Sequence, residues 1–151
     1  GVEASRQRRL LEERCCEVID LTRALIRLLR EDPTLAAQLG TFRGHAAVFG
    51  VSPVPEPTTP PFIVTQSISD ETLGTKGRVV REIQQDIAIY DDDDGGVADI
   101  ETIAEYIREK LRVHFDVPNW NMCGLQMSGP SINDVDELHG RVLTARITLD
   151  R

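Results

Sequence analysis

Four consecutive aspartates, Asp91, Asp92, Asp93 and Asp94, are the residues best suited to bind a cation or a partner. They follow the apolar residues 87–90 and precede two glycines. Four like charges resist burial, and the glycines let the chain reverse, so we interpret the run as a strongly negative turn between a strand and a helix. We predict that these aspartates form an acidic face bordering a site where something passes or docks.

The same stretch has part of the pattern of a twelve-residue calcium loop. With Gly95 at the turn position, Asp92 and Asp94 fall on ligand positions three and five, and Glu101 falls on the bidentate twelfth position. The first ligand would be Tyr90, and a phenol cannot replace the aspartate that belongs there. The loop also needs a helix before it, where the sequence favours a strand. A small calcium-binding or regulatory module using Tyr90 to Glu101 is therefore the alternative hypothesis.

The other groups capable of chemistry are three histidines and three cysteines: His45, His114, His139, Cys15, Cys16 and Cys123. None has catalytic or metal-ligand spacing, and two adjacent cysteines out of three make a poor disulfide framework. Residues 74–77 resemble a phosphate loop in composition only, because the register of that motif is missing. We predict no catalytic residue, no bound metal and no cofactor, so the protein is not expected to be an enzyme.

The bulk composition is that of one soluble domain. The chain has 151 residues, 40% of them hydrophobic and 28% charged, with a formal net charge of −8. That negative charge argues against tight nucleic-acid binding, which depends on neutralising phosphates. No apolar run approaches the length of a membrane span, and no signal peptide is evident, which favours a cytoplasmic protein.

The elements that must position these residues follow from hydrophobic spacing. Helical spacing predicts a long first helix over residues 10–30, a short second helix beginning after Asp32-Pro33, and a third helix over residues 97–113. The predicted strands cover residues 46–51, 62–69, 79–90, 121–127 and 140–150, although residues 79–90 also match a helix. Residues 70–77 and 128–138 are predicted loops, and the proline-rich residues 53–61 a stiff connection.

This order predicts a single α+β domain spanning residues 1–151. We expect a mainly antiparallel sheet of about four or five strands, because strands adjacent in sequence tend to pair. A long N-terminal helix with an extension over residues 1–20, a short helix and one further helix are expected to pack on a face of that sheet.

From about Leu21 to its end, the chain resembles the tail-terminator, or tail-completion, family of tailed bacteriophages. The resemblance lies in an amphipathic first helix, a proline-rich approach to the "PFIV" strand, the polar segment "SDETLGTKG" and the acidic turn "IAIYDDDDGG". The helix "VADIETIAEYIREKL" and the closing strand in "DELHGRVLTARITL" complete it. It is a similarity of pattern and order rather than of one specific motif.

The resemblance implies a structural virion protein without catalytic activity, located at the tail and neck and assembled in the host cytoplasm. Its copies would form a ring, commonly a hexamer, that caps the tail tube and joins it to the head through a neck or head-completion protein. DNA would pass through the ring without specific binding, and no membrane is involved. Candidate ring or partner contacts are Thr72, Leu73, Gly74, Thr75, Lys76, Gly77 and Trp120. For Trp120 a place at the edge of the core is the other possibility.

Overall fold

The computed structural model of the chain describes residues 21–50, 59–75, 77–92, 96–135 and 137–151. Residues 21–30 are helical, and they are followed by α2 (Pro33–Gln38), β1 (Thr41–Phe42), β2 (His45–Ala46), β3 (Val48–Phe49), β4 (Phe62–Thr75), β5 (Arg78–Asp91), α3 (Gly96–Lys110), β6 (Asn121–Ile132) and β7 (His139–Asp150). The predicted extension over residues 1–20 and most of the proline-rich connection lie outside the described residues.

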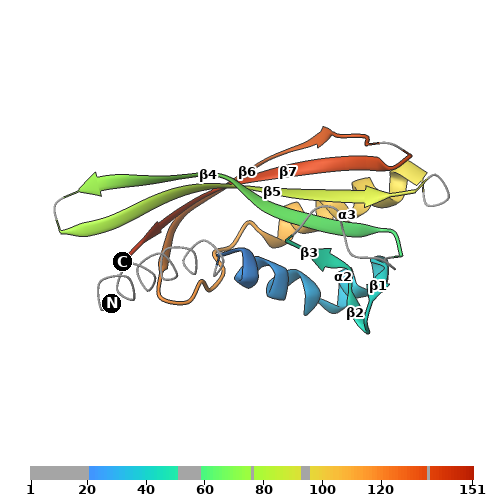
Figure 1. Cartoon of the computed structure of the whole chain (residues 1–151), viewed down its shortest axis with the longest axis horizontal. Coiled ribbons are helices and arrows are strands. Elements are labelled where there is room, and N and C mark those ends of the chain that lie inside the picture. Colours follow the sequence, from blue (N-terminus) through green and yellow to red (C-terminus); the bar gives the residue numbers. More distant parts are fainter. Residues whose placement is uncertain (1–20, 51–58, 76, 93–95, 136) are drawn as a thin grey trace, which may run out of the picture.

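Five strands form the main sheet in the order β3-β4-β5-β7-β6 (Figure 1). β4, β5, β7 and β6 pair antiparallel, whereas β3 pairs parallel with β4 through Val48–Ile63 and Phe49–Val64. β1 and β2 make a separate two-stranded sheet. The prediction of an α+β fold with a mainly antiparallel sheet is confirmed, with the correction that the sheet is mixed and a second, smaller sheet is present.

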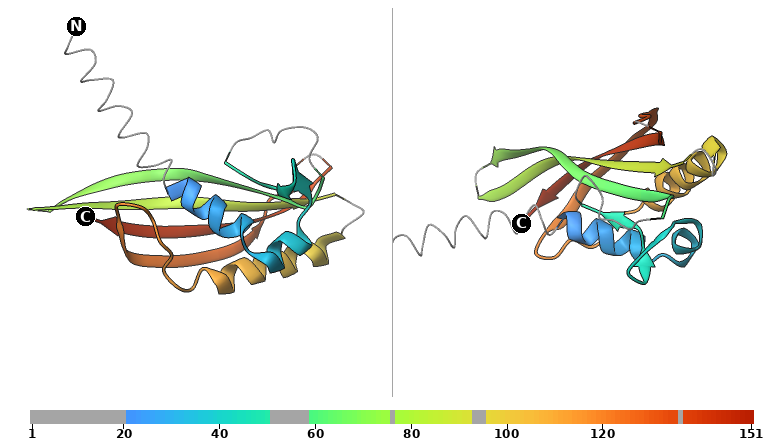
Figure 2. Two further views of the ribbon diagram at one scale, coloured as in Figure 1. Left: turned by 90° about the horizontal axis from the view of Figure 1, so that it is seen from below. Right: turned by 45° about the vertical axis from the view of Figure 1, so that its right-hand side comes forward.

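The helices lie on one face of the main sheet (Figure 2). Alternation along β5 places Ile83, Ile87 and Ile89 on that face, where all three are buried. The main core cluster joins the helices to the sheet and includes Leu25, Leu29, Leu35, Ile63, Ile87, Ile89, Ile103, Ile107 and Leu143. The apolar faces of the helices and the apolar face of the sheet thus pack against each other, as the hydrophobic spacing of the sequence indicates.

The second and third predicted helices are confirmed. Asp32 caps α2 by accepting hydrogen bonds from the backbone N–H groups of Thr34 and Leu35 at 2.9 and 3.1 Å, and proline occupies the first turn. In α3, Ile100 and Ile103 are buried on the sheet side. The ambiguous residues 79–90 are strand, as favoured.

Three predicted boundaries are wrong. Residues 70–77 are not a loop, because β4 continues to Thr75 and the chain turns at Gly77, whose φ is +81°. β6 likewise continues to Ile132, so the loop before β7 starts later than predicted. Of the strand predicted over residues 46–51, only Val48–Phe49 joins the main sheet.

Hydrophobic spacing does not predict the full length of β4 and β5, for a physical reason. The outer half of the β4–β5 hairpin has polar residues on both faces, so its sequence does not alternate between apolar and polar residues. Its strand conformation depends instead on pairing that runs from Phe62–Tyr90 to Thr75–Arg78, with one irregularity between Ser67 and Ser69.

Candidate functional site

The end of the β4–β5 hairpin is the first candidate contact surface. β7 pairs with β5 as far as Asp150, opposite Val80, and Arg151 exchanges backbone hydrogen bonds with Val79, so Thr75, Gly77 and Arg78 extend beyond the end of β7. Arg81 forms an ion pair with Asp70 across the hairpin, with 3.0 Å between Nε and Oδ1. The predicted contacts Thr72 and Leu73 are exposed residues of β4. Gly74 and Thr75 are the last residues of that strand, and Lys76 lies outside the described residues.

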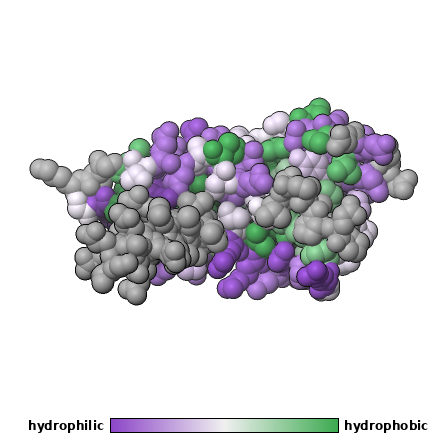
Figure 3. Space-filling model, viewed as in Figure 1, coloured by the Kyte–Doolittle hydropathy of each residue, from purple (hydrophilic) through white to green (hydrophobic). Residues whose placement is uncertain are grey.

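Apolar side chains are exposed along this hairpin. Ile68, Leu73 and Val79 are 55%, 41% and 44% exposed. On the face shown in Figure 3, the coloured hydrophobic residues form small separate groups among hydrophilic ones. Large apolar side chains exposed on a hairpin mark a surface that a partner can cover.

Both edges of the main sheet are open within the described residues. β3 covers β4 only at Ile63 and Val64, so β4 has no strand neighbour on its outer side from residue 65 onward. β6 forms the opposite edge and pairs only with β7. Unpaired strand edges present backbone N–H and C=O groups that can pair with another chain.

Trp120 lies at the edge of the core. Its side chain is 7% exposed and packs in a cluster with Ile83 and Leu149. The guanidinium carbons of Arg81 and Arg151 lie 5.6 and 4.6 Å from its ring centroid, which is cation–π geometry. The structure therefore connects Trp120 to the hairpin through Arg81, and it places the tryptophan as a core-edge residue rather than an exposed anchor.

The acidic run is divided by the fold. Asp91 is the last residue of β5 and is 3% exposed, and Asp92 is half-buried. Asp93 and Asp94 lie outside the described residues. The expectation that all four carboxylates avoid burial is wrong for Asp91, because strand alternation carries it to the same face as Ile87 and Ile89.

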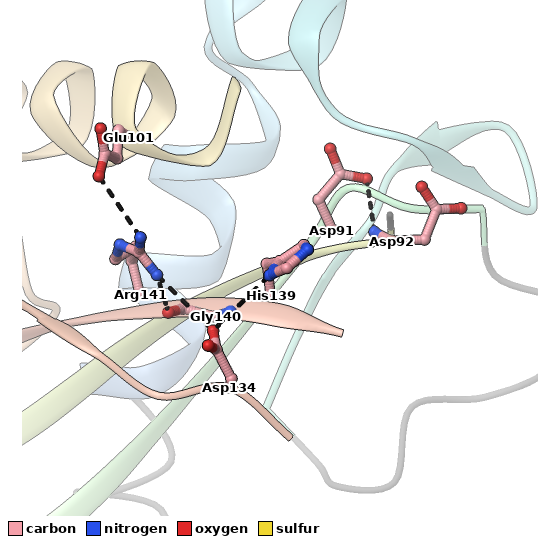
Figure 4. A network of polar contacts seen from close by, with 7 residues as sticks. All are labelled: Asp91, Asp92, Glu101, Asp134, His139, Gly140 and Arg141. Carbon is pink, nitrogen blue, oxygen red and sulfur yellow. Dashed lines mark hydrogen bonds and ion pairs between the residues drawn. The ribbon is translucent and has the colours of Figure 1, made fainter. Parts of the chain in front are cut away.

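The Asp91 carboxylate is buried at the end of β5. Its Oδ1 accepts a 2.8 Å hydrogen bond from the Asp92 backbone N–H, while its other oxygen points away from that group (Figure 4). Burial raises the pKa of Asp91, the Asp92 N–H lowers it, and the charges of Asp92 and Asp99 raise it further. In the described part of the chain no cationic side chain pairs with Asp91.

A groove of about 580 Å³ opens beside this carboxylate. Its lining comes from α2, the residues just before β4, the end of β5 with the residue after it, and the first turns of α3: Gln38, Pro60, Pro61, Asp91, Asp92, Asp99, Thr102 and Ile103. We call it the acidic groove. The lining includes three carboxylates, from Asp91, Asp92 and Asp99, together with apolar side chains.

The secondary structure around the acidic run does not fit a calcium-binding loop. A calcium loop of this kind lies between two helices. Residues before Asp92 belong to strand β5, and α3 already begins at Gly96, inside the twelve residues that the loop would need.

A further polar network, which the sequence did not suggest, lies at the start of β7 (Figure 4). Arg141 is 8% exposed and donates to the Gly140 carbonyl at 2.8 Å, and it approaches Glu101 of α3 at 3.4 Å and Asp134 at 3.7 Å. Asp134 also accepts from the Gly140 N–H at 3.0 Å. The network connects the segment before β7 to α3 and so holds one end of the helix on the sheet.

Asp91→Asn is expected to stabilise the isolated chain at neutral pH. Because the pKa of Asp91 is raised in the folded state, its stabilising contribution is present below the unfolded pKa and is lost as pH rises through the folded pKa. The amide has no charge to desolvate. Thermal unfolding should therefore give a higher Tm for the variant at pH 7 and a smaller difference at pH 4. An equal or lower Tm at pH 7 would contradict the account of Asp91.

Both the sequence and the fold of the chain have counterparts among known proteins. The family model described as "Tail completion protein gp17" matches residues 23–149. No curated protein matches the chain. Among solved structures, a chain of "Virion of native gene transfer agent (GTA) particle" is similar, with a TM-score of 0.70 and 20% identity over 87% of this chain and 95% of that one. At that identity the structural similarity is one of fold. The described part of this chain contains no helix long and apolar enough to span a membrane.

Proposed function

The chain belongs to the tail completion protein gp17 family, and on that premise we propose that its copies close into a ring that caps the tail tube and joins it to the head. Membership of this family makes the chain a structural protein of the virion tail. The proposed partners are other copies of the chain, the tail tube protein and a neck or head-completion protein. The proposed role is structural and involves no catalysis.

The observation that carries the proposal is the pair of sheet edges, at β4 and β6, that no other described strand covers. A closed ring needs a heterologous interface, in which one surface of a copy meets a different surface of the next. The outer edge of β4 and the outer edge of β6 are two such surfaces on opposite sides of one sheet. Backbone pairing of β4 with β6 of the neighbour would satisfy both edges in every copy.

The hairpin residues gain a role in this arrangement. We assign Thr72, Leu73, Gly74 and Thr75 of β4, with the turn at Gly77 and its neighbour Lys76, to contacts within the ring or with the tube. Ile68 and Leu73 are exposed in the single copy and would be covered by the neighbouring copy. Trp120 supports the hairpin through Arg81 and is assigned no direct contact.

The net negative charge of the proposed ring is compatible with DNA passing through it. Six copies at −8 each would carry 6 × (−8) = −48 charges. DNA binding depends on cations that replace the counterions of its phosphates, and a negatively charged ring supplies few of them. The proposed ring would therefore let DNA pass without retaining it.

The capping role is tested by electron microscopy of purified tail tubes mixed with the chain. The proposal expects one additional ring at one end of each tube, and tubes treated in this way should no longer elongate when tube protein is added. Tubes that bind the protein along their whole length, or that elongate unchanged, would contradict it.

A further inference from the structure

The face of the main sheet opposite the helices is polar in its central part. The helices of the described chain lie on the other face (Figure 2). Along β5, the residues that alternate with the buried Ile83, Gln85 and Ile87 point to the face without helices, and so do the residues of β7 that pair with them. We call this surface the polar sheet face and define it by Glu82, Gln84, Asp86, Thr144, Arg146 and Thr148.

Side chains of the polar sheet face bond to one another across the strands. The Thr144 hydroxyl donates to Asp86 Oδ1 at 3.0 Å, and Arg146 Nε lies 3.4 Å from Glu82 Oε1. A hollow of about 450 Å³ opens on this face and is lined mainly by polar residues of β5, β6 and β7. The centre of a surface that binds another protein is usually poor in charged residues. The composition of the polar sheet face therefore favours contact with water over burial by a protein.

The strand directions allow the sheet to continue from copy to copy in the proposed ring, on which this step rests. β4, β5, β7 and β6 alternate in direction, and their number is even. Copies related by rotation about an axis along the strands keep these directions, so β4 of one copy would run antiparallel to β6 of the next. Four strands from each copy would then close into one antiparallel sheet around the axis.

The thickness of the helix layer determines which face of that closed sheet points inward. Six copies would supply 6 × 4 = 24 strands. At a spacing of about 4.8 Å and a tilt of about 40°, these strands form a circle with a radius of about 24 Å. Helix axes about 10 Å further in would lie on a circle with a circumference of about 90 Å.

The helices do not fit inside that circle. Residues 21–30 and α3 provide two helices in each copy, or 6 × 2 = 12 in the ring. At about 10 Å across, twelve helices side by side need about 120 Å, more than the inner circle offers. On the outer side, a circle about 10 Å beyond the strands has a circumference of about 210 Å and holds them easily.

We propose that the helices form the outside of the ring and that the polar sheet face lines its passage. DNA would then move along side chains that are already bonded to one another across the strands. The carboxylates of Glu82 and Asp86 outnumber the cation of Arg146 among the six residues that define the face. A lining of this charge provides few cations to replace the counterions of the phosphates, so DNA would pass without being held.

Threading of DNA tests this placement. Glu82→Lys with Asp86→Lys changes the charge of the polar sheet face by 2 × 2 = +4 in each copy. Preassembled rings of this variant should bind linear double-stranded DNA at least about 100-fold more tightly than wild-type rings, and high salt should remove the gain. Closed circular DNA of the same sequence has no end that can enter a ring, so its binding should remain at the wild-type level. Electrophoretic mobility shifts measure both affinities.

A matched variant of α3 is the control. Glu105→Lys with Glu109→Lys makes the same change of charge on two well-exposed side chains of the helix layer. These lysines would lie outside the ring, so linear and circular DNA should bind them equally. The inference is overturned if rings with lysine at positions 82 and 86 bind both forms equally or bind neither. A preference of the α3 variant for linear DNA would overturn it too.

A second variant covers the case in which the first does not assemble. Gln84→Lys with Thr148→Lys keeps both carboxylates of the polar sheet face and should give the same preference for linear DNA. Native mass spectrometry confirms the ring of each variant before DNA is added. Failure of both variants to assemble would also contradict the inference, because a lining in contact with water tolerates lysine.

The inference and the proposed function can fail separately. If the wild-type chain forms rings and neither variant prefers linear DNA, the placement of the polar sheet face is wrong and the ring stands. If the wild-type chain forms no ring, the proposed function is wrong, and the lining of a passage is wrong with it.

Discussion

Replacing Asp32 with alanine is expected to lower the free energy of unfolding by about 3 kcal/mol, because one carboxylate holds two helices together. Asp32 is 6% exposed and caps α2. It also forms an ion pair with Lys110 at 2.6 Å and accepts hydrogen bonds from the Tyr106 hydroxyl at 2.9 and 3.0 Å, both from α3. Alanine leaves the α2 N–H groups, the phenol and the ammonium group without this acceptor.

Urea unfolding followed by circular dichroism measures this loss. Asp32→Asn retains an oxygen that can cap the helix and should lie between the wild type and the alanine variant. Asp116→Ala, a change at an exposed aspartate, is the control and should stay within about 0.5 kcal/mol of the wild type. A loss below about 1 kcal/mol for Asp32→Ala would contradict the role assigned to the carboxylate.

The stability that Asp32 contributes is expected to change with pH in the opposite direction to that of Asp91. Burial alone raises the pKa of Asp32, but hydrogen bonds from Lys110, from the Leu35 N–H and from Tyr106, together with the charge of Lys110, outweigh it and lower the pKa. The stability that Asp32 contributes is therefore present above its unfolded pKa and is lost as pH falls through its lower folded pKa. The difference in stability between wild type and Asp32→Ala should shrink below pH about 4.

Ile68→Lys combined with Leu73→Lys is expected to abolish ring formation and leave the fold intact. Both side chains are well exposed in the single copy, so the substitutions should change its stability by less than about 1 kcal/mol. In the proposed ring, each lysine would place a charge in a surface covered by the neighbouring copy. Charged residues on strand edges are a common natural barrier to edge pairing.

Size-exclusion chromatography with light scattering separates the two outcomes. The double variant should elute as a single copy under conditions in which the wild type assembles. Val113→Lys is the matched control, because Val113 is 70% exposed and follows α3 in the chain, outside both edge strands β4 and β6. A double variant that assembles like the wild type would exclude the hairpin from the ring contacts.

The parts of the fold that the sequence predicted well are those with local signals. Asp32-Pro33 starts α2 through a side-chain cap, and the apolar spacing of Ile100, Ile103 and Ile107 determines α3 through burial of one face. β7 was evident because its alternate residues face the helices. In each case the signal lies within one element and does not depend on its partner.

The remaining features depend on contacts between distant segments. Gln85 is fully buried and donates from Nε2 to the Thr65 hydroxyl at 2.9 Å and to the Thr22 hydroxyl at 3.4 Å. These hydrogen bonds connect a helix to two strands, and no sequence pattern predicts them. Asp91 looked like one of four equivalent aspartates, and only the register of β5 distinguishes it from the others. The length of the hairpin depends on cross-strand pairing in the same way.

Native mass spectrometry of the wild-type chain, alone and with tail tubes, tests the central claim most directly. The account predicts one closed assembly with a mass that is an integer multiple of the 16.8 kDa chain, and six copies would give 6 × 16.8 = 100.8 kDa. The assembly should be lost in the variant with lysine at positions 68 and 73. A wild-type chain that remains a single copy with tubes present, or that forms an unlimited series of masses, would contradict it.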